Sequence, residues 1–122
     1  MPFDWRDFLG LARFLQQATE THPPTSAEAR LRTAVSRAYF AAYAISARAA
    51  EKRYGFSPTG KAEDHRLLRE CLKRHKRTDL ARGLDQLRQL RNCCDYNNRV
   101  EGLEQMAEEA LAYAQDIIER VE

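Results

Sequence analysis

Apolar residues recur along most of this chain with the spacing of an α-helix, in stretches separated by prolines, glycines and polar turns. The first stretch, roughly residues 4–20, has its apolar side chains at intervals of three and four: Trp5, Phe8, Ala12 and Leu15. These intervals place the side chains on one helical face. Two prolines in "THPPTS" are expected to end this helix, and Thr25 or Ser26 to cap the next one.

The second stretch, roughly residues 26–53, is apolar around most of its circumference. Its main stripe repeats at intervals of four and three: Leu31, Val35, Ala38, Ala42, Ile45 and Ala49. Three aromatic residues, Tyr39, Phe40 and Tyr43, widen that stripe. A helix that is apolar on nearly all sides is a buried one, so this stretch is expected to form the centre of the fold.

Three more helices are predicted, over roughly residues 62–75, 78–96 and 99–121, with Thr78 or Asp79 as a cap between the first two. Gly83 weakens the second of these helices slightly, and no stretch follows the period-two pattern of a strand. The chain is therefore predicted to be all-α, a single helical domain over residues 1–122. The expected architecture is an antiparallel up-and-down four-helix bundle with the third helix split, which gives four to five helices.

Composition excludes several classes of protein. The chain has 122 residues, of which 43% are hydrophobic and 31% charged, as in an ordinary globular domain. The first ten residues lack the basic and apolar regions of a signal peptide, and the longest near-apolar stretch, "AYFAAYAISA", is too short to span a bilayer. Three cysteines, two of them adjacent, do not suggest a disulfide framework. We expect a cytoplasmic protein with no membrane partner.

The charges are distributed unevenly along the chain. Residues 1–60 carry +3, residues 61–99 carry +5 and residues 100–122 carry −6, for a net +2. The segment "RLLRECLKRHKR" (66–77) has six basic residues and one acid. Such a segment either contacts phosphate, through residues such as Lys73 and Arg74, or forms a solvated face that balances the acidic last helix.

Histidine and cysteine do not form a recognisable metal site. Cys71 and His75 are one helical turn apart, but the paired spacings of zinc ligands are absent. The adjacent Cys93 and Cys94 point in different directions on a helix, so buried cysteines are the expected reading and neither metal nor cofactor is predicted. His65 follows "AED" at a helix start, where it either serves a site or, more commonly, packs over the helix end.

The segment "LRQLRNCCDYNN" (87–98) places charged residues beside leucines. Arg88, Arg91 and Asp95 share one helical face, and the last two form an i, i+4 pair. This pair either stabilises its helix locally or belongs to a polar cleft, and we favour the cleft. Arg37 lies in the apolar second helix, where an unpaired cation is costly to bury. Arg37 therefore either leans to the surface or has a carboxylate partner, and a structural ion pair between Arg37 and Asp95 is predicted.

The segments "TAVSRAYFAAYAISARA" and "LRQLRNCCDYNN", followed by an alanine-rich last helix, resemble the HEPN (higher eukaryotes and prokaryotes nucleotide-binding) domain. The likeness is to small prokaryotic members with S-R-A-Y-Y-A and R-x-x-A-D-Y motifs, and it covers about residues 4–120. It implies a homodimeric helical bundle whose arginine-bearing helix ends meet across a cleft. Many members are metal-independent ribonucleases with an Arg-x4–6-His motif, and many are toxins paired with a minimal nucleotidyltransferase antitoxin.

Carried onto this chain, the resemblance makes Arg91 the motif arginine, but the expected histidine is replaced by Tyr96, Asn97 or Asn98. The resemblance implies catalytic roles for Arg91, Asp95 and Tyr96. Phosphate contacts are expected from Arg88, Arg91 and Asn97 in this segment, and from Lys73 and Arg74 in the basic segment. Tyr is a poor base at pH 7 and Asn does not titrate, so RNA binding with weak or no cleavage is expected. Tyr96 is also a candidate acceptor for modification by the partner. The alternative is a non-catalytic helical module that binds protein.

Overall fold

The structure, a computed structural model, describes residues 2–18 and 26–122, and every regular element within these residues is a helix. The five helices are α1 (Arg6–Gln17), α2 (Ala27–Tyr54), α3 (Asp64–Arg74), α4 (Thr78–Tyr96) and α5 (Leu103–Val121). The predicted all-α class is thus confirmed. None of the described helices combines the length and the apolar character that crossing a membrane requires.

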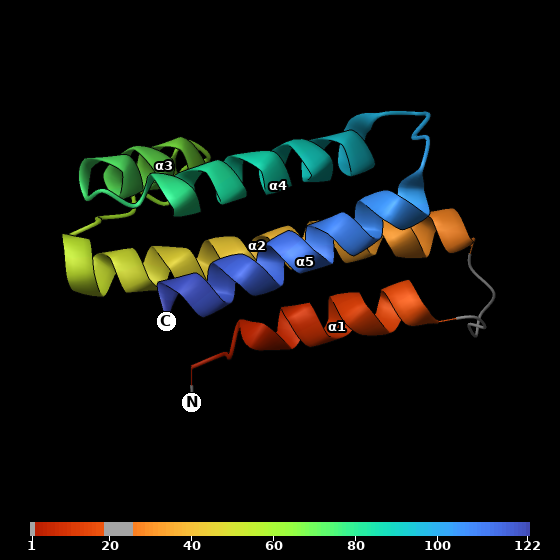
Figure 1. The fold of residues 1–122 in the computed structure, drawn as a ribbon, viewed down its shortest axis with the longest axis horizontal. Coiled ribbons are helices and arrows are strands. Elements are labelled where there is room, and N and C mark those ends of the chain that lie inside the picture. Colours follow the sequence, from red (N-terminus) through yellow and green to blue (C-terminus); the bar gives the residue numbers. More distant parts are fainter. Residues whose placement is uncertain (1, 19–25) are drawn as a thin grey trace.

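The four longer helices alternate in direction, as the sequence predicts for an up-and-down bundle. In Figure 1, α1 and α4 run from left to right, whereas α2 and α5 run back from right to left. Helix α2 is central because it contacts all four other helices, most extensively α5 and α1. The side chains of α2 are therefore the ones that face every other part of the described fold.

Helix α2 owes its length of 28 residues to good signals at both ends. The Ser26 side chain accepts a hydrogen bond from the Ala29 amide at 3.0 Å, which caps the first turn as predicted for this position. At the other end Gly55 adopts φ +68°, a left-handed conformation that suits glycine. The Phe56 amide then bonds back to the Ala50 carbonyl, and the Phe56 side chain is buried in the core.

The third helix is split as expected, but its two parts do not continue in one line. Arg69 and Asp85 are 16 residues apart and would lie about 24 Å apart along a straight helix, yet their side chains approach to 3.7 Å. Helices α3 and α4 therefore fold back on each other as a hairpin. The turn contains Lys76 at φ +63°. Neither Thr78 nor Asp79 caps α4, because Arg77 precedes the helix and makes no side-chain capping bond.

Helix α5 begins at Leu103, later than the sequence pattern suggests, because Gly102 with φ +64° ends the preceding bend. It packs closely on α4 at Gly83. A Cβ atom at Gly83 would lie 3.0 Å from side-chain atoms of Ile117. Gly83, which weakens the helix when read from sequence, thus permits the two helices to approach.

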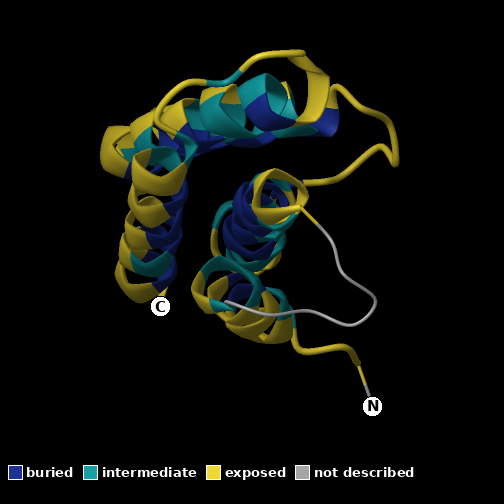
Figure 2. Ribbon diagram, turned by 90° about the vertical axis from the view of Figure 1, so that its right-hand side faces the viewer, coloured by how far each residue is buried: buried dark blue, intermediate teal, exposed yellow. Residues whose placement is uncertain are grey.

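Small residues form much of the buried core. Helices α2 and α5 contribute alanines with no exposed surface: Ala34, Ala38, Ala41, Ala42, Ala107, Ala110 and Ala114. Because alanine is short, helix axes lined with it approach closely. Figure 2 shows that the buried parts of the helices face one another, with the exposed parts on the outside. The largest fully buried side chain is Tyr39 of α2, and the next largest, such as Leu68, Leu80 and Leu87, come from α3 and α4.

Candidate functional site

The last turns of α4 carry the ion pair that its sequence spacing indicates. Arg91 Nε lies 2.8 Å from Asp95 Oδ2, and the Ser36 hydroxyl on α2 donates a longer bond of 3.5 Å to the same oxygen. The Arg91 guanidinium lies 5.2 Å from the centroid of the Phe40 ring. The side chains of Arg91 and Asp95 are only 22% and 26% exposed, so salt screens their attraction less than it does at an open surface.

The predicted ion pair between Arg37 and Asp95 is wrong. Among the residues that the structure describes, Arg37 has no carboxylate within 4.0 Å, and Asp95 pairs with Arg91 instead. The Arg37 guanidinium lies over the rings of Phe8 and Phe40, at 5.0 and 4.9 Å from their centroids. Aromatic faces stabilise a cation without any carboxylate, and Phe8 belongs to α1. Arg37 is thus directed to the α1 side of α2.

A tyrosine–histidine pair lies on the side of α2 that faces α3. The Tyr39 hydroxyl is hydrogen-bonded to His65 Nδ1, and the two rings are stacked with centroids 5.5 Å apart. The Tyr43 ring also stacks on this imidazole, with the two ring centroids 4.0 Å apart. Tyr39 is almost fully buried and His65 partly so. The pair therefore joins the middle of α2 to the first turn of α3.

Burial and nearby cations favour the neutral imidazole in this pair. The pKa of His65 is lowered, first by burial and then by the positive charges of Arg91 and Arg69. The pKa of Tyr39 is raised, chiefly because burial disfavours the phenolate. His65 is consequently unprotonated at pH 7, and Tyr39 keeps its proton.

Two further arginines complete the surroundings of this pair. Arg88 NH2 lies 2.9 Å from Asp85 Oδ1, and Arg69 Nε lies 3.7 Å from the same oxygen. The hydrogen bond from Arg88 is the main reason why the pKa of Asp85 is lowered. Both arginines, together with Arg91, are close enough to Tyr39 to act on the pKa of its hydroxyl.

We call Arg69, Arg88 and Arg91, with the Tyr39–His65 pair between them, the arginine cluster. Its three guanidinium groups face two carboxylates, Asp85 and Asp95, and a neutral imidazole. The cluster therefore carries one excess positive charge. Guanidinium groups present their N–H donors in a planar fork that matches phosphate oxygens, so the arrangement is suited to binding an anion.

Arg32 holds the end of α4 in place beside the cluster. Its NH1 atom donates to the carbonyl oxygens of Cys94 at 2.9 Å and Asn97 at 2.6 Å, and NH2 reaches Asn98 O at 3.3 Å. A cation at the C-terminus of a helix satisfies carbonyls that lack helical partners and complements the helix dipole. The backbone that carries Arg91 and Asp95 is thereby tied to α2.

Tyr96 and Asn97, which the resemblance places in the site, lie at the outer rim of the cluster. The Tyr96 side chain is 71% exposed, and its ring lies 5.9 Å from the Arg91 guanidinium. Asn97 is exposed, and its Nδ2 atom donates to Cys93 Sγ at 3.4 Å. The Tyr96 hydroxyl is accordingly open to a second molecule.

Lys73 and Arg74, both predicted to contact phosphate, lie in the last turn of α3 and are exposed. Lys73 does not belong to the arginine cluster and instead lines a groove along α4, described below. Arg74 lines neither feature in the described structure. The basic segment 66–77 is thus divided between different surfaces, because consecutive helical residues point about 100° apart.

The cysteines have structural surroundings. Cys71 and Cys94 are buried, and Cys94 Sγ lies 3.5 Å from Met106 Sδ. Burial raises the pKa of the Cys94 thiol to about 11. His75 contacts Cys71 and stacks on Tyr54 at 4.7 Å. Across residues 2–18 and 26–122, no three His, Cys, Asp or Glu side chains are grouped so as to hold a metal ion.

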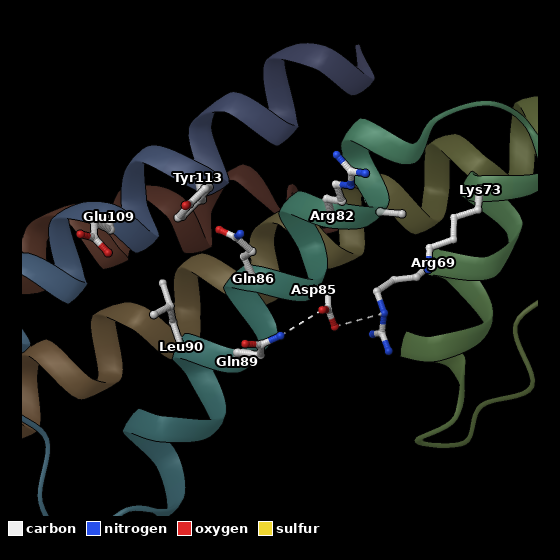
Figure 3. Close-up of a pocket in the computed structure, with 10 residues that line it drawn as sticks. Arg69, Lys73, Arg82, Asp85, Gln86, Gln89, Leu90, Glu109 and Tyr113 are labelled. Atoms are coloured by element: carbon white, nitrogen blue, oxygen red, sulfur yellow. Dashed lines mark hydrogen bonds and ion pairs between the residues drawn. The ribbon is translucent and has the colours of Figure 1, made fainter.

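A groove of about 470 Å³ runs along the outer face of α4, between α3 and α5. Figure 3 shows its lining: Arg69, Lys73, Ala81, Arg82, Asp85, Gln86, Gln89, Leu90, Glu109 and Tyr113. Its lining is mainly polar, with three cations and two carboxylates. Arg69 and Asp85 belong both to this groove and to the network around the arginine cluster.

Sequence reasoning identified Arg88, Arg91 and Asp95 but did not place Tyr39 and Arg69 in the site. The sequence indicates only that Tyr39 belongs to an apolar surface, and it leaves two roles open for His65. One signal was available, because Tyr39 and Tyr43 are one turn apart on the aromatic edge of α2. That spacing indicates a shared partner for the two rings, although the identity of the partner depends on how α3 folds back.

Comparison with known proteins finds no relative of this chain. No protein-family model, curated protein or solved structure matches the chain.

Proposed function

We propose that this protein is a HEPN-like, homodimeric RNA-binding protein whose phosphate-binding site is the arginine cluster. The observation that supports this most directly is the gathering of three arginines around the Tyr39–His65 pair. The Arg91 guanidinium lies 5.8 Å from the centroid of the Tyr39 ring, Arg69 donates to the His65 carbonyl at 3.2 Å, and Arg88 shares Asp85 with Arg69. Charge-assisted bonds from arginine to phosphate are among the stronger hydrogen bonds in proteins. An RNA backbone would offset the excess positive charge that the cluster carries.

Binding with little cleavage is the expected behaviour. His65 is neutral at pH 7, which suits a general base, but its Nδ1 atom is already bonded to the buried Tyr39 hydroxyl. Only Nε2 is left for a substrate, and the α4 motif itself supplies no histidine. The loss of one acid–base group typically reduces a rate by about 10²–10⁴-fold. We therefore expect that the protein alone binds RNA and cleaves it weakly or not at all.

The proposed dimer would bring the ends of two α4 helices together. The exposed Tyr96 ring next to Arg91 supplies apolar surface at that end, and a two-fold axis repeats the same patch on both subunits. By resemblance, the partner is a minimal nucleotidyltransferase within a toxin–antitoxin or defence system. The open Tyr96 hydroxyl is the acceptor that such a partner would modify.

The binding test compares arginines from two sides of α2. Fluorescence anisotropy with a labelled single-stranded RNA would be measured at several salt concentrations for the wild type, Arg91→Ala and Arg48→Ala. Arg48 is a matched control, because it lies over Trp5 on the α1 side. We expect that Arg91→Ala weakens binding about tenfold or more and makes its salt dependence less steep, whereas Arg48→Ala leaves both unchanged.

Unchanged RNA affinity in Arg91→Ala would remove the arginine cluster from consideration. Robust metal-free cleavage that disappears in His65→Gln would instead show that His65 acts as the catalytic base, and the protein would then be a ribonuclease. Light scattering that finds only a monomer at tens of micromolar would contradict the dimer.

A second candidate, a helical module that binds protein, is favoured by one observation. Leu11 and Phe14 lie one turn apart on α1 and are 42% and 68% exposed. Large apolar side chains that are adjacent at the surface mark interaction sites. This candidate predicts that Phe14→Ala disrupts association with the partner while RNA affinity is absent in every variant.

A further inference from the structure

Another cavity of the described structure lies on the α1 side of α2 and shares no lining residue with the arginine cluster. It has a volume of about 260 Å³ and lies at the left end of Figure 1, where the start of α1, the last turns of α2 and the end of α5 meet. We call it the Trp5 pocket. Its lining is mainly apolar, with contributions from Phe3, Trp5, Ile45, Ala49 and Val121. Ligand pockets usually measure about 300–1,000 Å³, so this one is suited to a small molecule.

Two cations of α2 line the Trp5 pocket and have no carboxylate partner. Arg48 and Lys52 are one helical turn apart, and neither lies within 4.0 Å of a carboxylate among residues 2–18 and 26–122. The Arg48 guanidinium lies 5.9 Å from the centroid of the Trp5 ring. Like charges at this spacing destabilise a helix, and an anion bound between them would relieve their repulsion.

The other charged residues of the pocket already have partners. Arg6 forms ion pairs with Asp4, at 3.7 Å, and with Glu122. Arg53 donates to the carbonyl oxygens of Val121 and, at 3.4 Å, of Glu122, which ties the end of α5 to α2. Four cationic and two acidic side chains line the pocket. The lining therefore carries two excess positive charges, and the two unpaired cations of α2 account for them.

The indole of Trp5 adds a hydrogen-bond donor that is not used within the described structure. The Trp5 side chain is only partly exposed, and its Nε1 atom is buried without a hydrogen-bond partner among the described residues. Buried polar groups are normally hydrogen-bonded. An oxygen atom of a ligand would supply the missing acceptor.

We propose that the Trp5 pocket binds a small aliphatic carboxylate, with its charged group between Arg48 and Lys52. The hydrocarbon chain of this ligand lies against Ile45 and Ala49. A guanidinium group matches a carboxylate in a planar, two-bond geometry, while the apolar lining gains from covering the chain. An inorganic anion would leave the apolar lining uncovered, and an uncharged apolar molecule would leave both cations unpaired. The charge and the apolar surface of the pocket together select a molecule that has both.

The position of the pocket predicts an effect of the ligand on stability. Its lining comes from the start of α1, from α2 and from the end of α5, so the complete site exists only in the folded chain. A ligand that binds the folded state alone stabilises it by mass action. The melting temperature should therefore rise with the concentration of the carboxylate. This site goes beyond the proposed function, because it involves no residue of the arginine cluster.

Fluorescence titration tests the proposal, because Trp5 is the single tryptophan of the chain and reports on the pocket directly. The full chain would be titrated at low salt with butanoate, hexanoate and octanoate, and with octanamide as an uncharged analogue. Each pair of added methylene groups should tighten binding about tenfold, because one buried methylene is worth about fourfold in affinity. We expect that octanamide binds at least about tenfold more weakly than octanoate, since it leaves both cations unpaired.

Matched variants separate the charged part of the pocket from the apolar part. The double variant Arg48→Gln, Lys52→Gln should weaken octanoate binding at least about tenfold, with the rise in melting temperature as a second readout. Its control is Lys61→Gln, Arg99→Gln, which removes the same charge from exposed residues outside the pocket. Ala49→Leu fills part of the apolar space, so it should weaken octanoate binding more than butanoate binding.

Equal affinity for butanoate and octanoate, or for octanoate and octanamide, would overturn the proposal. An unchanged octanoate affinity in the Arg48 and Lys52 double variant would do so as well. Arg91→Ala distinguishes this result from the proposed function, because it should reduce RNA affinity but leave octanoate affinity unchanged. Circular dichroism would establish that each variant keeps the helical content of the wild type.

Discussion

The face of α2 turned to α1 and the face turned to α3 and α4 both carry arginines, but these arginines have different partners. Toward α1, Arg37 and Arg48 lie over aromatic rings, and neither has a carboxylate partner among the described residues. Toward α3 and α4, guanidinium groups meet carboxylates, a tyrosine and a histidine. Arginine alone therefore does not define a site, and the titratable neighbours distinguish the second face.

One arginine performs the same structural task on each face. Arg30 donates to the carbonyls of Leu15, at 3.0 Å, and Ala18 at the end of α1. Arg32 donates to the carbonyls that end α4. The two residues are two positions apart on α2 and hold the ends of two different helices. Variants of Arg30 and Arg32 can therefore be compared directly, one for each face.

The largest expected effect comes from the buried aromatic residue on the α3–α4 face. Tyr39→Ala removes a ring that is 1% exposed, and such truncations cost about 3–5 kcal/mol in the free energy of unfolding. Urea denaturation would measure this loss. Phe14→Ala on α1 is the control, since Phe14 is 68% exposed. A comparable loss of stability in that variant would show that the burial of Tyr39 is not the cause.

The paired arginines give the next largest effect. Arg30→Ala and Arg32→Ala each remove charged donors from helix-end carbonyls, and each is expected to cost about 1.5–3 kcal/mol of stability. Only Arg32→Ala should also weaken RNA binding, because it loosens the turn that carries Arg91. Denaturation and anisotropy would be compared in the same two variants. If both variants changed RNA affinity equally, RNA binding would not be specific to the face of α2 that is turned to α3 and α4.

The pH dependence of stability should distinguish the faces more weakly, because His65 is only partly buried. In the unfolded chain His65 titrates near its ordinary pKa of about 6.5, whereas burial and Arg91 lower that pKa in the folded protein. Below pH 6.5 the unfolded state therefore binds more protons, and stability falls as the pH falls. The stability that the neutral His65 contributes is fully present above pH 6.5, and it is lost as the pH falls through the lowered pKa of His65 in the folded protein.

The measurement is the free energy of unfolding between pH 5 and pH 7 in wild type and His65→Gln. Glutamine accepts the Tyr39 hydrogen bond but does not titrate, so the slope with pH should be smaller in the variant. The lowered pKa values of Asp64 and Asp85 act at more acidic pH and leave this window clear. Parallel slopes in both proteins would show that His65 is not responsible.

The smallest expected effect tests which arginine is coupled to Asp95. A double-mutant cycle with Arg91→Met and Asp95→Asn should give a coupling energy of about 0.5–1 kcal/mol, as for a partly exposed ion pair. The same cycle with Arg37→Met should be additive within about 0.5 kcal/mol. Coupling between Arg37 and Asp95 that exceeds the coupling of Arg91 would reinstate the pair that the structure replaces.

Several features were within reach of the sequence because they depend on neighbouring residues. Apolar spacing and breakers locate five helices, Ser26 is one of the two caps that the sequence offers for α2, and the Arg91–Asp95 pair follows from i, i+4 spacing. These interactions form within one or two helical turns. A local pattern therefore determines them whatever the rest of the chain does.

The tertiary structure decides which neighbouring helix covers each face of α2. Arg37 follows Ser36 by a single residue, yet one faces Phe8 of α1 and the other Asp95 of α4. Periodicity assigns each residue to a face but does not state which helix covers that face. The hairpin of α3 and α4 sets this, since it brings His65 to Tyr39 and Arg69 to Asp85.

The sequence by itself determined that the chain is helical, where each helix lies and which residues share a face, because these follow from local spacing and capping. Only the tertiary structure decided that Tyr39, His65 and three arginines gather at one place and that a polar groove opens along α4. Those residues come from three helices and are separated by up to 52 positions, between Tyr39 and Arg91. Their approach depends on how alanine-lined helices pack and where α3 turns back, and no pattern within a single helix encodes that.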